Sequence, residues 1–192
     1  MKPVLMIHEV EEWLFELPLE DYILTFDDGL YSQYYYYNKL QHINTEKIFF
    51  ISSNIICNGT QSLDFPVCAE AHKKAFAGNT EDYMTIEQIK ELMQDPVVSI
   101  GGHSHAHTRL GNYTKLIEKM QQLKDDTELM MEWFTTNLGV SPIKFCFPYN
   151  DDYQGMYTAV LTRYGFTDFY GRERISAETL LHTLFPQHSH DT

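Results

Sequence analysis

Short apolar runs of strand type alternate with helical segments along most of the chain, and this alternation restricts the fold more than any other feature. The strand-type runs span 3–8, 22–26, 46–52, 97–102, 143–147 and 166–170. Helical patterns cover 30–42, 85–94, 113–137 and 153–164, and we expect one more short helix in the tail from 172 to 192. Such a repeat implies a parallel sheet with helical crossovers. Because the chain is short for eight strand–helix units, we expect a distorted or incomplete (β/α) barrel of about six to seven parallel strands, with an open doubly wound sheet as the alternative.

Polar residues follow these predicted strands at their carboxyl ends. They are His8, Asp27, Asp28, His103, Pro148, Tyr149, Arg172 and Arg174. Barrels of parallel strands build their active sites on that face, and open parallel sheets bind ligands at the same strand ends. The sequence therefore predicts one site assembled from these residues.

Two adjacent acids, Asp27 and Asp28, end the apolar run that begins at Tyr22. Neighbouring side chains of a regular strand point to opposite faces, so both acids can serve one site only if the strand stops there. Gly29 permits that stop, because glycine turns the chain sharply without a φ penalty. The alternative is a plain hydrophilic turn, since Asp and Gly are common turn residues.

Two histidines, His103 and His107, follow the apolar run that ends at Gly102. If the chain is helical there, the two rings lie one turn apart on one face, a geometry that lets two imidazoles share a metal ion. A carboxylate from the Asp27–Asp28 pair would complete a set of two histidines and one acid, with positions left open for water and substrate.

Both segments resemble the motifs of a known family. Thr25–Gly29 and His103–His107 are similar to TFDDG and H-[ST]-x-x-H, the first two motifs of the polysaccharide deacetylases of the NodB-homology group, carbohydrate esterase family 4. The residues 145–150, Phe-Cys-Phe-Pro-Tyr-Asn, look like the third motif of a branch that reads F-A-Y-P-Y-G. The resemblance covers most of the chain and implies the same incomplete barrel.

The resemblance implies a role for each matched residue. Asp28, His103 and His107 would hold a divalent metal ion, and Asp27 would be the general base. The backbone N–H of Tyr149 would stabilise the oxyanion, with Pro148 fixing φ just before it. Imidazole and carboxylate ligands with open positions suit Zn²⁺ best.

Two further roles depart from the commonest family pattern. Cys146 stands where most members have an arginine that braces the base, and Arg174 is the counterpart implied by the branch, paired with Asp27; the alternative is an ordinary surface arginine. For the general acid, His182 in Leu-Leu-His imitates the family's late L-x-H segment but lies in a helical pattern, and His8 at the end of the first strand is its rival. A non-catalytic histidine is the alternative for both.

Length and charge limit the class of protein. At 192 residues we expect a single domain spanning 1–192, and the net charge of −13 argues against nucleic-acid or anionic-membrane partners. No apolar run reaches spanning length, and the N-terminus is too short and too soon charged for a secretory signal, which predicts a cytoplasmic protein. The long irregular stretch 53–83 is expected to contact substrate.

Together these patterns predict a metal-dependent hydrolase that removes the acetyl group from an N-acetylated sugar. The absence of a signal or anchor favours a cytoplasmic precursor of a surface polysaccharide as substrate. The alternatives are a hydrolase of another small or cyclic amide on the same metal site, and a non-catalytic sugar-binding relative. The sequence leaves the oligomeric state open.

Overall fold

Seven parallel strands form one sheet in the computed structural model, which describes residues 2–186. They are β1 (Val4–Ile7), β2 (Ile23–Phe26), β3 (Lys47–Ile51), β4 (Val98–Gly102), β5 (Lys144–Cys146), β6 (Asp168–Tyr170) and β7 (Ile175–Ser176). Their order across the sheet is β6-β5-β4-β3-β2-β1-β7. Each of the six pairings is parallel.

This strand order confirms the incomplete barrel and excludes the doubly wound alternative. From β1 to β6 every strand lies beside its neighbour in sequence, whereas a doubly wound sheet reverses its strand order at a switch point. β7 pairs with β1, as the last strand of a barrel does, through Leu5 opposite Ile175 and Met6 opposite Ser176. Within the described part of the chain β6 and β7 do not pair, so the curled sheet is open at that seam.

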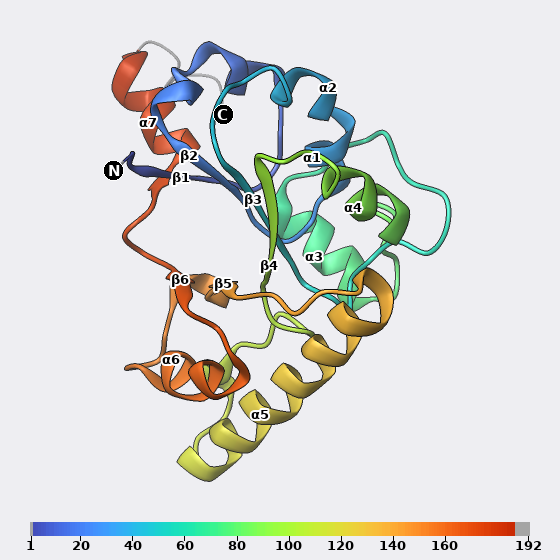
Figure 1. Ribbon diagram of the computed structural model, residues 1–192, viewed down its shortest axis with the longest axis vertical. Helices are drawn as coiled ribbons and strands as arrows, with labels where there is room; N and C mark the ends of the chain where they lie inside the picture. The colour runs from blue at the N-terminus through green and yellow to red at the C-terminus, as the bar shows by residue number, and fades with distance from the viewer. Residues whose placement is uncertain (1, 187–192) are drawn as a thin grey trace.

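The helices lie around the sheet. They are α1 (Tyr31–Tyr35), α2 (Tyr37–Leu40), α3 (Cys68–Phe76), α4 (Ile86–Leu92), α5 (Leu116–Trp133), α6 (Met156–Leu161) and α7 (Ala177–Leu184). Figure 1 shows α1 to α4 gathered on one side of β2–β4, α5 and α6 near β4–β6, and α7 beside β1. None of the helices in the described residues is long and apolar enough to cross a membrane.

Local sequence explains where several of these helices begin and end. Thr85 caps α4 in a capping box with Gln88, in which each side chain binds the other residue's backbone N–H. α5 continues as a π-helical turn to Leu138 and ends at Gly139, whose φ of 70° is the left-handed conformation that glycine tolerates at a helix end.

The core combines aliphatic side chains with several buried aromatic rings. Phe26 and Phe49 are fully buried and stack at 4.5 Å between centroids. Complete burial of such a side chain contributes about 1.5–3 kcal/mol. At the end of β4, a Cβ added to Gly102 would lie 2.7 Å from Sδ of Met130, so the missing side chain lets α5 pack against the strand. These contacts hold the strand end that leads into His103.

Two sequence expectations need correction, and one short strand was not located from the sequence. The stretch 53–83 is not irregular throughout, because it contains α3. The expected helix 30–42 is divided at Tyr36 into α1 and α2. The two-residue strand β7 was not expected, because so short a strand has no detectable alternation. The tail helix is present as α7, and 187–192 lie outside the described residues.

Candidate metal centre

Side chains from four strand ends line one pocket of about 590 Å³ at the carboxyl edge of the sheet. His8 follows β1, Asp27 and Asp28 follow β2, His103 follows β4, and Tyr149 follows β5. Cys68 and His72 reach the same pocket from α3, and Glu178 reaches it from α7. The structure thus brings these strand-end residues together, as the parallel topology predicts, but Arg172 is exposed and does not line this pocket.

Asp28 is at the centre of this pocket. Its φ of 73° and the φ of 81° at Gly29 place two successive residues in the left-handed region, so the chain turns sharply where β2 ends. Aspartate is among the few non-glycine residues that tolerate this region. The turn leaves the Asp28 carboxylate 1% exposed and directed into the pocket beside Asp27.

Three imidazole nitrogens converge on Oδ1 of Asp28. Nε2 of His103 lies 3.2 Å from this oxygen, and Nε2 of His107 and Nε2 of His72 each lie 3.3 Å from it. Donor atoms of Asp28, His103 and His107 all lie within 4.8 Å of one another. Oδ1 is buried and has no hydrogen-bond partner among the described residues.

These groups fit a divalent cation. Nδ1 of His103 lies 2.8 Å from the carbonyl oxygen of Cys146, which only accepts, so Nδ1 carries a proton and Nε2 is the ring nitrogen that faces Asp28. Burial lowers the pKa of His107 to about 3, which keeps that imidazole neutral. Ligand atoms about 2.0–2.1 Å from a tetrahedral zinc ion are separated by roughly 3.3 Å, close to the spacing found here.

The segment that carries the two predicted histidine ligands is not helical, which corrects the expected geometry. Ser104 has φ 71° and His107 has φ 49°, so the chain bends twice between the rings. Asp126 on α5 holds this bend: its carboxylate accepts hydrogen bonds from the backbone N–H of His105 at 2.8 Å and of Ala106 at 2.9 Å. The two rings reach one oxygen through a loop, not through the i, i+4 face of a helix.

Asp27 forms a buried, two-pronged ion pair with Arg174. Nη1 and Nη2 of Arg174 donate to Oδ1 and Oδ2 of Asp27, each at 2.7 Å. Burial alone would raise the pKa of Asp27, but the charge and hydrogen bonds of Arg174 hold this pKa below its ordinary value. Asp27 is therefore an oriented carboxylate at neutral pH.

Arg174 is itself fully engaged, so it is not a surface arginine. It is 7% exposed, and besides Asp27 it donates to Oγ1 of Thr25 at 3.0 Å and Oδ1 of Asn150 at 2.7 Å. Sγ of Cys146 lies 3.0 Å from Nη2. The small side chain of Cys146 thus lies directly against the guanidinium that reaches Asp27.

Tyr149 also lines the pocket. It has φ 58°, directly after Pro148, and its backbone N–H has no acceptor among residues 2–186. Its ring is 4.8 Å from the ring of His107, and the guanidinium of Arg109 lies 4.4 Å from its centroid. Arg109 and Tyr149 therefore form one wall beside the His107 ring.

The two candidate general acids are placed differently. Nε2 of His8 lies 4.0 Å from Oδ2 of Asp27, and the His8 side chain is 29% exposed and lines the pocket. His182 is on α7, exposed, and is not among the residues that line this pocket. The structure therefore brings His8 to the site and does not bring His182.

Five residues named at or near the site were missed by the sequence analysis: Cys68, His72, Arg109, Asp126 and Glu178. A signal existed for the first two, because Cys68 and His72 have the i, i+4 spacing of one helical face. This spacing carries no information unless the segment is helical, and the sequence predicts no helix in 53–83. Nothing in the sequence connects Asp126 or Arg109 with residues far along the chain.

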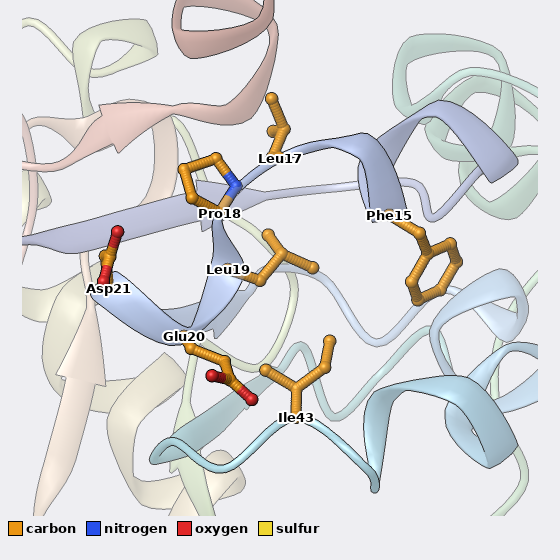
Figure 2. A pocket seen from close by; sticks show the side chains of 7 residues that line it. All are labelled: Phe15, Leu17, Pro18, Leu19, Glu20, Asp21 and Ile43. Atoms are coloured by element: carbon orange, nitrogen blue, oxygen red, sulfur yellow. The ribbon is translucent and has the colours of Figure 1, made fainter.

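A second cleft of about 410 Å³ lies away from these residues, between the β1–β2 connection and Ile43 (Figure 2). Its lining is mainly apolar, and Glu20 and Asp21 are its only ionisable residues. It contains none of the residues around Asp28, so the site is assigned to the carboxyl edge of the sheet.

Comparison with known proteins identifies the family and the fold. The family profile described as polysaccharide deacetylase matches residues 18–169. IcaB from Ammonifex degensii superposes with a TM-score of 0.66 at 17% identity, covering 94% of each chain. The deacetylase PplD from Streptococcus pyogenes gives 0.61 at 14% identity, covering 96% of this chain and 98% of that one. A de-N-acetylase from Aggregatibacter actinomycetemcomitans gives 0.61 at 14%, covering 89% and 77%.

No curated protein matches the chain in sequence. At identities this low the structural neighbours establish the shared fold, while the family profile covers most of the chain. The chain belongs to the polysaccharide deacetylase family, whose members are deacetylating hydrolases.

Proposed function

We propose that this chain is a metal-dependent hydrolase that removes the N-acetyl group from a sugar, with Asp28, His103 and His107 as metal ligands. One observation carries the proposal: the buried Oδ1 of Asp28 has no hydrogen-bond partner among the described residues, yet two histidine nitrogens lie 3.2 and 3.3 Å from it. A cation between these atoms would satisfy all three. Nitrogen and carboxylate donors favour zinc among the divalent ions.

A divalent ion in this site would act as a Lewis acid and lower the pKa of a bound water to about 7. Asp27 would take the proton of the attacking water as general base. Its depressed pKa keeps it ionised at neutral pH, and Arg174 holds both of its oxygens in one orientation. The backbone N–H of Tyr149 has no acceptor among the described residues and would donate to the developing oxyanion.

Protonation of the departing amine is assigned to His8. This side chain lines the pocket, is 29% exposed and lies beside Asp27. A partly exposed imidazole can take a proton from solvent and deliver it within the pocket. His182 has no place in this scheme, because it is exposed on α7 away from the pocket lining.

An N-acetylated sugar is the substrate class that the family supports. The S. pyogenes deacetylase was solved with acetate, the acid that hydrolysis of an acetamide releases. The pocket of about 590 Å³ has the size of a small-molecule site. The cytoplasmic location and a polysaccharide precursor as substrate stay predictions from the sequence.

The test is release of acetate from defined N-acetylated sugars by the purified protein. Nucleotide-linked and lipid-linked sugars are compared with peptidoglycan and chitin oligomers, with zinc-loaded, chelator-treated and reconstituted enzyme. We expect acetate only with metal present, and fastest from an activated sugar. Faster release of acetate from polymer fragments would rule out the prediction that the substrate is a polysaccharide precursor. Acetate release that survives complete metal removal would contradict the mechanism.

A further inference from the structure

Helix α3 presents two side chains to the pocket that the proposed mechanism does not use. Cys68 and His72 lie one helical turn apart and both line the pocket. Sγ of Cys68 donates to Oδ2 of Asp28 at 3.1 Å, and Nδ1 of His72 lies 3.2 Å from the same sulfur. α3 therefore contacts the proposed metal ligand through a linked cysteine–histidine pair.

The hydrogen bonds of this pair define which nitrogen of His72 is available. The thiol has one hydrogen, and it is directed to Oδ2 of Asp28. Nδ1 of His72 must then be the donor to Sγ, which leaves Nε2 of a neutral ring as a lone pair. That nitrogen is buried, lies 3.3 Å from Oδ1 of Asp28 and has no hydrogen-bond partner among the described residues.

Two unpartnered lone pairs thus face each other in a buried site, which is costly without a cation between them. His72 resembles His103 and His107 in this contact, since all three Nε2 atoms lie 3.2–3.3 Å from Oδ1 of Asp28. Its ring packs 4.4 Å from the ring of His107 and 5.5 Å from the ring of Phe76. The ring is therefore held in place at the metal site.

His72 also has the outer partner that metal-binding histidines need. Such histidines donate their second ring N–H to a neighbouring acceptor, which fixes the ring. His103 does so to the carbonyl of Cys146, and His72 does so to Sγ of Cys68. Nδ1 of His107 has no such partner among the described residues. By this criterion His72 is better prepared as a ligand than His107.

We propose that His72 is a further ligand of the metal ion, added to Asp28, His103 and His107, with Cys68 orienting its ring. The proposal rests on the proposed metal site. With four protein ligands, zinc would bind water by becoming five-coordinate, which zinc sites allow. The ligand atoms of Asp28, His103 and His107 all lie within 4.8 Å of one another, and His72 is not part of that group. Coordination by His72 would therefore draw α3 toward the ion. Metal binding would then order α3 as well as the site.

The test measures zinc affinity and coordination without using activity. Wild-type protein, His72→Ala and His72→Phe are titrated with zinc against a chromophoric chelator, and zinc K-edge X-ray absorption counts the imidazole ligands. His72→Phe keeps a ring for stacking on Phe76 but has no lone pair. We expect at least about a tenfold weaker zinc affinity in both variants, and a fall from three imidazoles to two. Zinc should slow amide exchange in α3 of wild type but not of His72→Phe.

Controls separate this inference from the proposed function. His105→Ala should bind zinc like wild type, because its ring contacts Ser53 and not Asp28. Circular dichroism of the metal-free variants verifies folding. The role of His72 would be overturned if wild type and His72→Phe bound zinc with the same affinity and both showed two imidazole ligands. That result would leave the metal site itself intact. No zinc bound by wild type would overturn the metal site and this inference together.

Discussion

Arg174 holds both carboxylate oxygens of Asp27 at 2.7 Å, although the two residues are separated by 147 positions in the chain. Such a planar, two-pronged contact restrains the carboxylate more than a single ammonium would. In this protein the arginine comes from the connection between β6 and β7, where it lies against Cys146.

Replacement of Arg174 by methionine should change the pH dependence of both stability and activity. In the wild type the low pKa of Asp27 contributes stability that is present above the ordinary aspartate pKa of about 3.9 and is lost as pH falls through the lower folded value. Without the guanidinium, burial raises this pKa, so the acidic limb of kcat/KM should move to higher pH. The unpaired carboxylate should cost about 3–5 kcal/mol of stability near pH 7.

Arg172→Met is the matched control for this change. Arg172 is two residues away, with its side chain 76% exposed, and contacts Asp151 at 3.6 Å. Its replacement should leave the pH profile and stability nearly unchanged. Equal shifts in the two variants would show that general charge, and not the pairing with Asp27, sets the profile.

Asp27→Asn should retain the metal and lose most of the turnover. The amide keeps the size of the carboxylate but cannot accept a proton, and loss of a general base costs about 10²–10⁴-fold in rate. Elemental analysis of metal content beside initial rates provides the measurement. If the variant lost metal and activity together, Asp27 would be a ligand and its assignment as base would be wrong.

Asp28→Ala and His107→Ala should bind zinc far more weakly than wild type. Each variant removes one of the three ligand atoms, from Asp28, His103 and His107, that lie within 4.8 Å of one another. Metal content after dialysis against a defined free-zinc buffer measures this. Full retention of zinc by His107→Ala would remove His107 from the ligand set.

Asp126→Asn should destabilise the loop that carries the histidine ligands. The carboxylate accepts from two backbone N–H groups, and replacing a charged acceptor with an amide should cost about 1–3 kcal/mol. Zinc affinity should fall with stability, as thermal unfolding and metal titration would reveal. Asp125→Asn is the control, since Asp125 is exposed and its carboxylate accepts a hydrogen bond from Gln121 on the same helix, away from the histidine loop. An equal effect in both variants would argue against a specific role for Asp126.

His8→Ala should lower turnover by about 10²-fold or more with little change in zinc content, because His8 lines the pocket beside Asp27 and is not one of the three proposed ligands. His182→Ala should behave like wild type in the same assay. A larger loss from His182→Ala would mean that α7 closes over the pocket when substrate binds.

The sequence by itself determined the architecture of this protein and the polar residues that follow its strands at the pocket. Alternating strand and helix patterns predicted the parallel incomplete barrel, because hydrophobic periodicity is local and survives in any context. Because parallel strands end at the same edge of the sheet, the pattern also predicted that the residues after the strands lie together. These residues are His8, Asp27, Asp28, His103 and Tyr149.

Tertiary structure decided the contacts between segments that no local pattern links. The sequence was compatible with a surface position for Arg174, but the β6–β7 connection places it against Asp27. The sequence was also compatible with His182 at the pocket, but α7 leaves this side chain exposed. His72 and Asp126 act on the site from α3 and α5, whose packing depends on side-chain fit across the core. Periodicity specifies which face of a segment is buried, but the partner of a buried polar group depends on distances that only the folded chain defines.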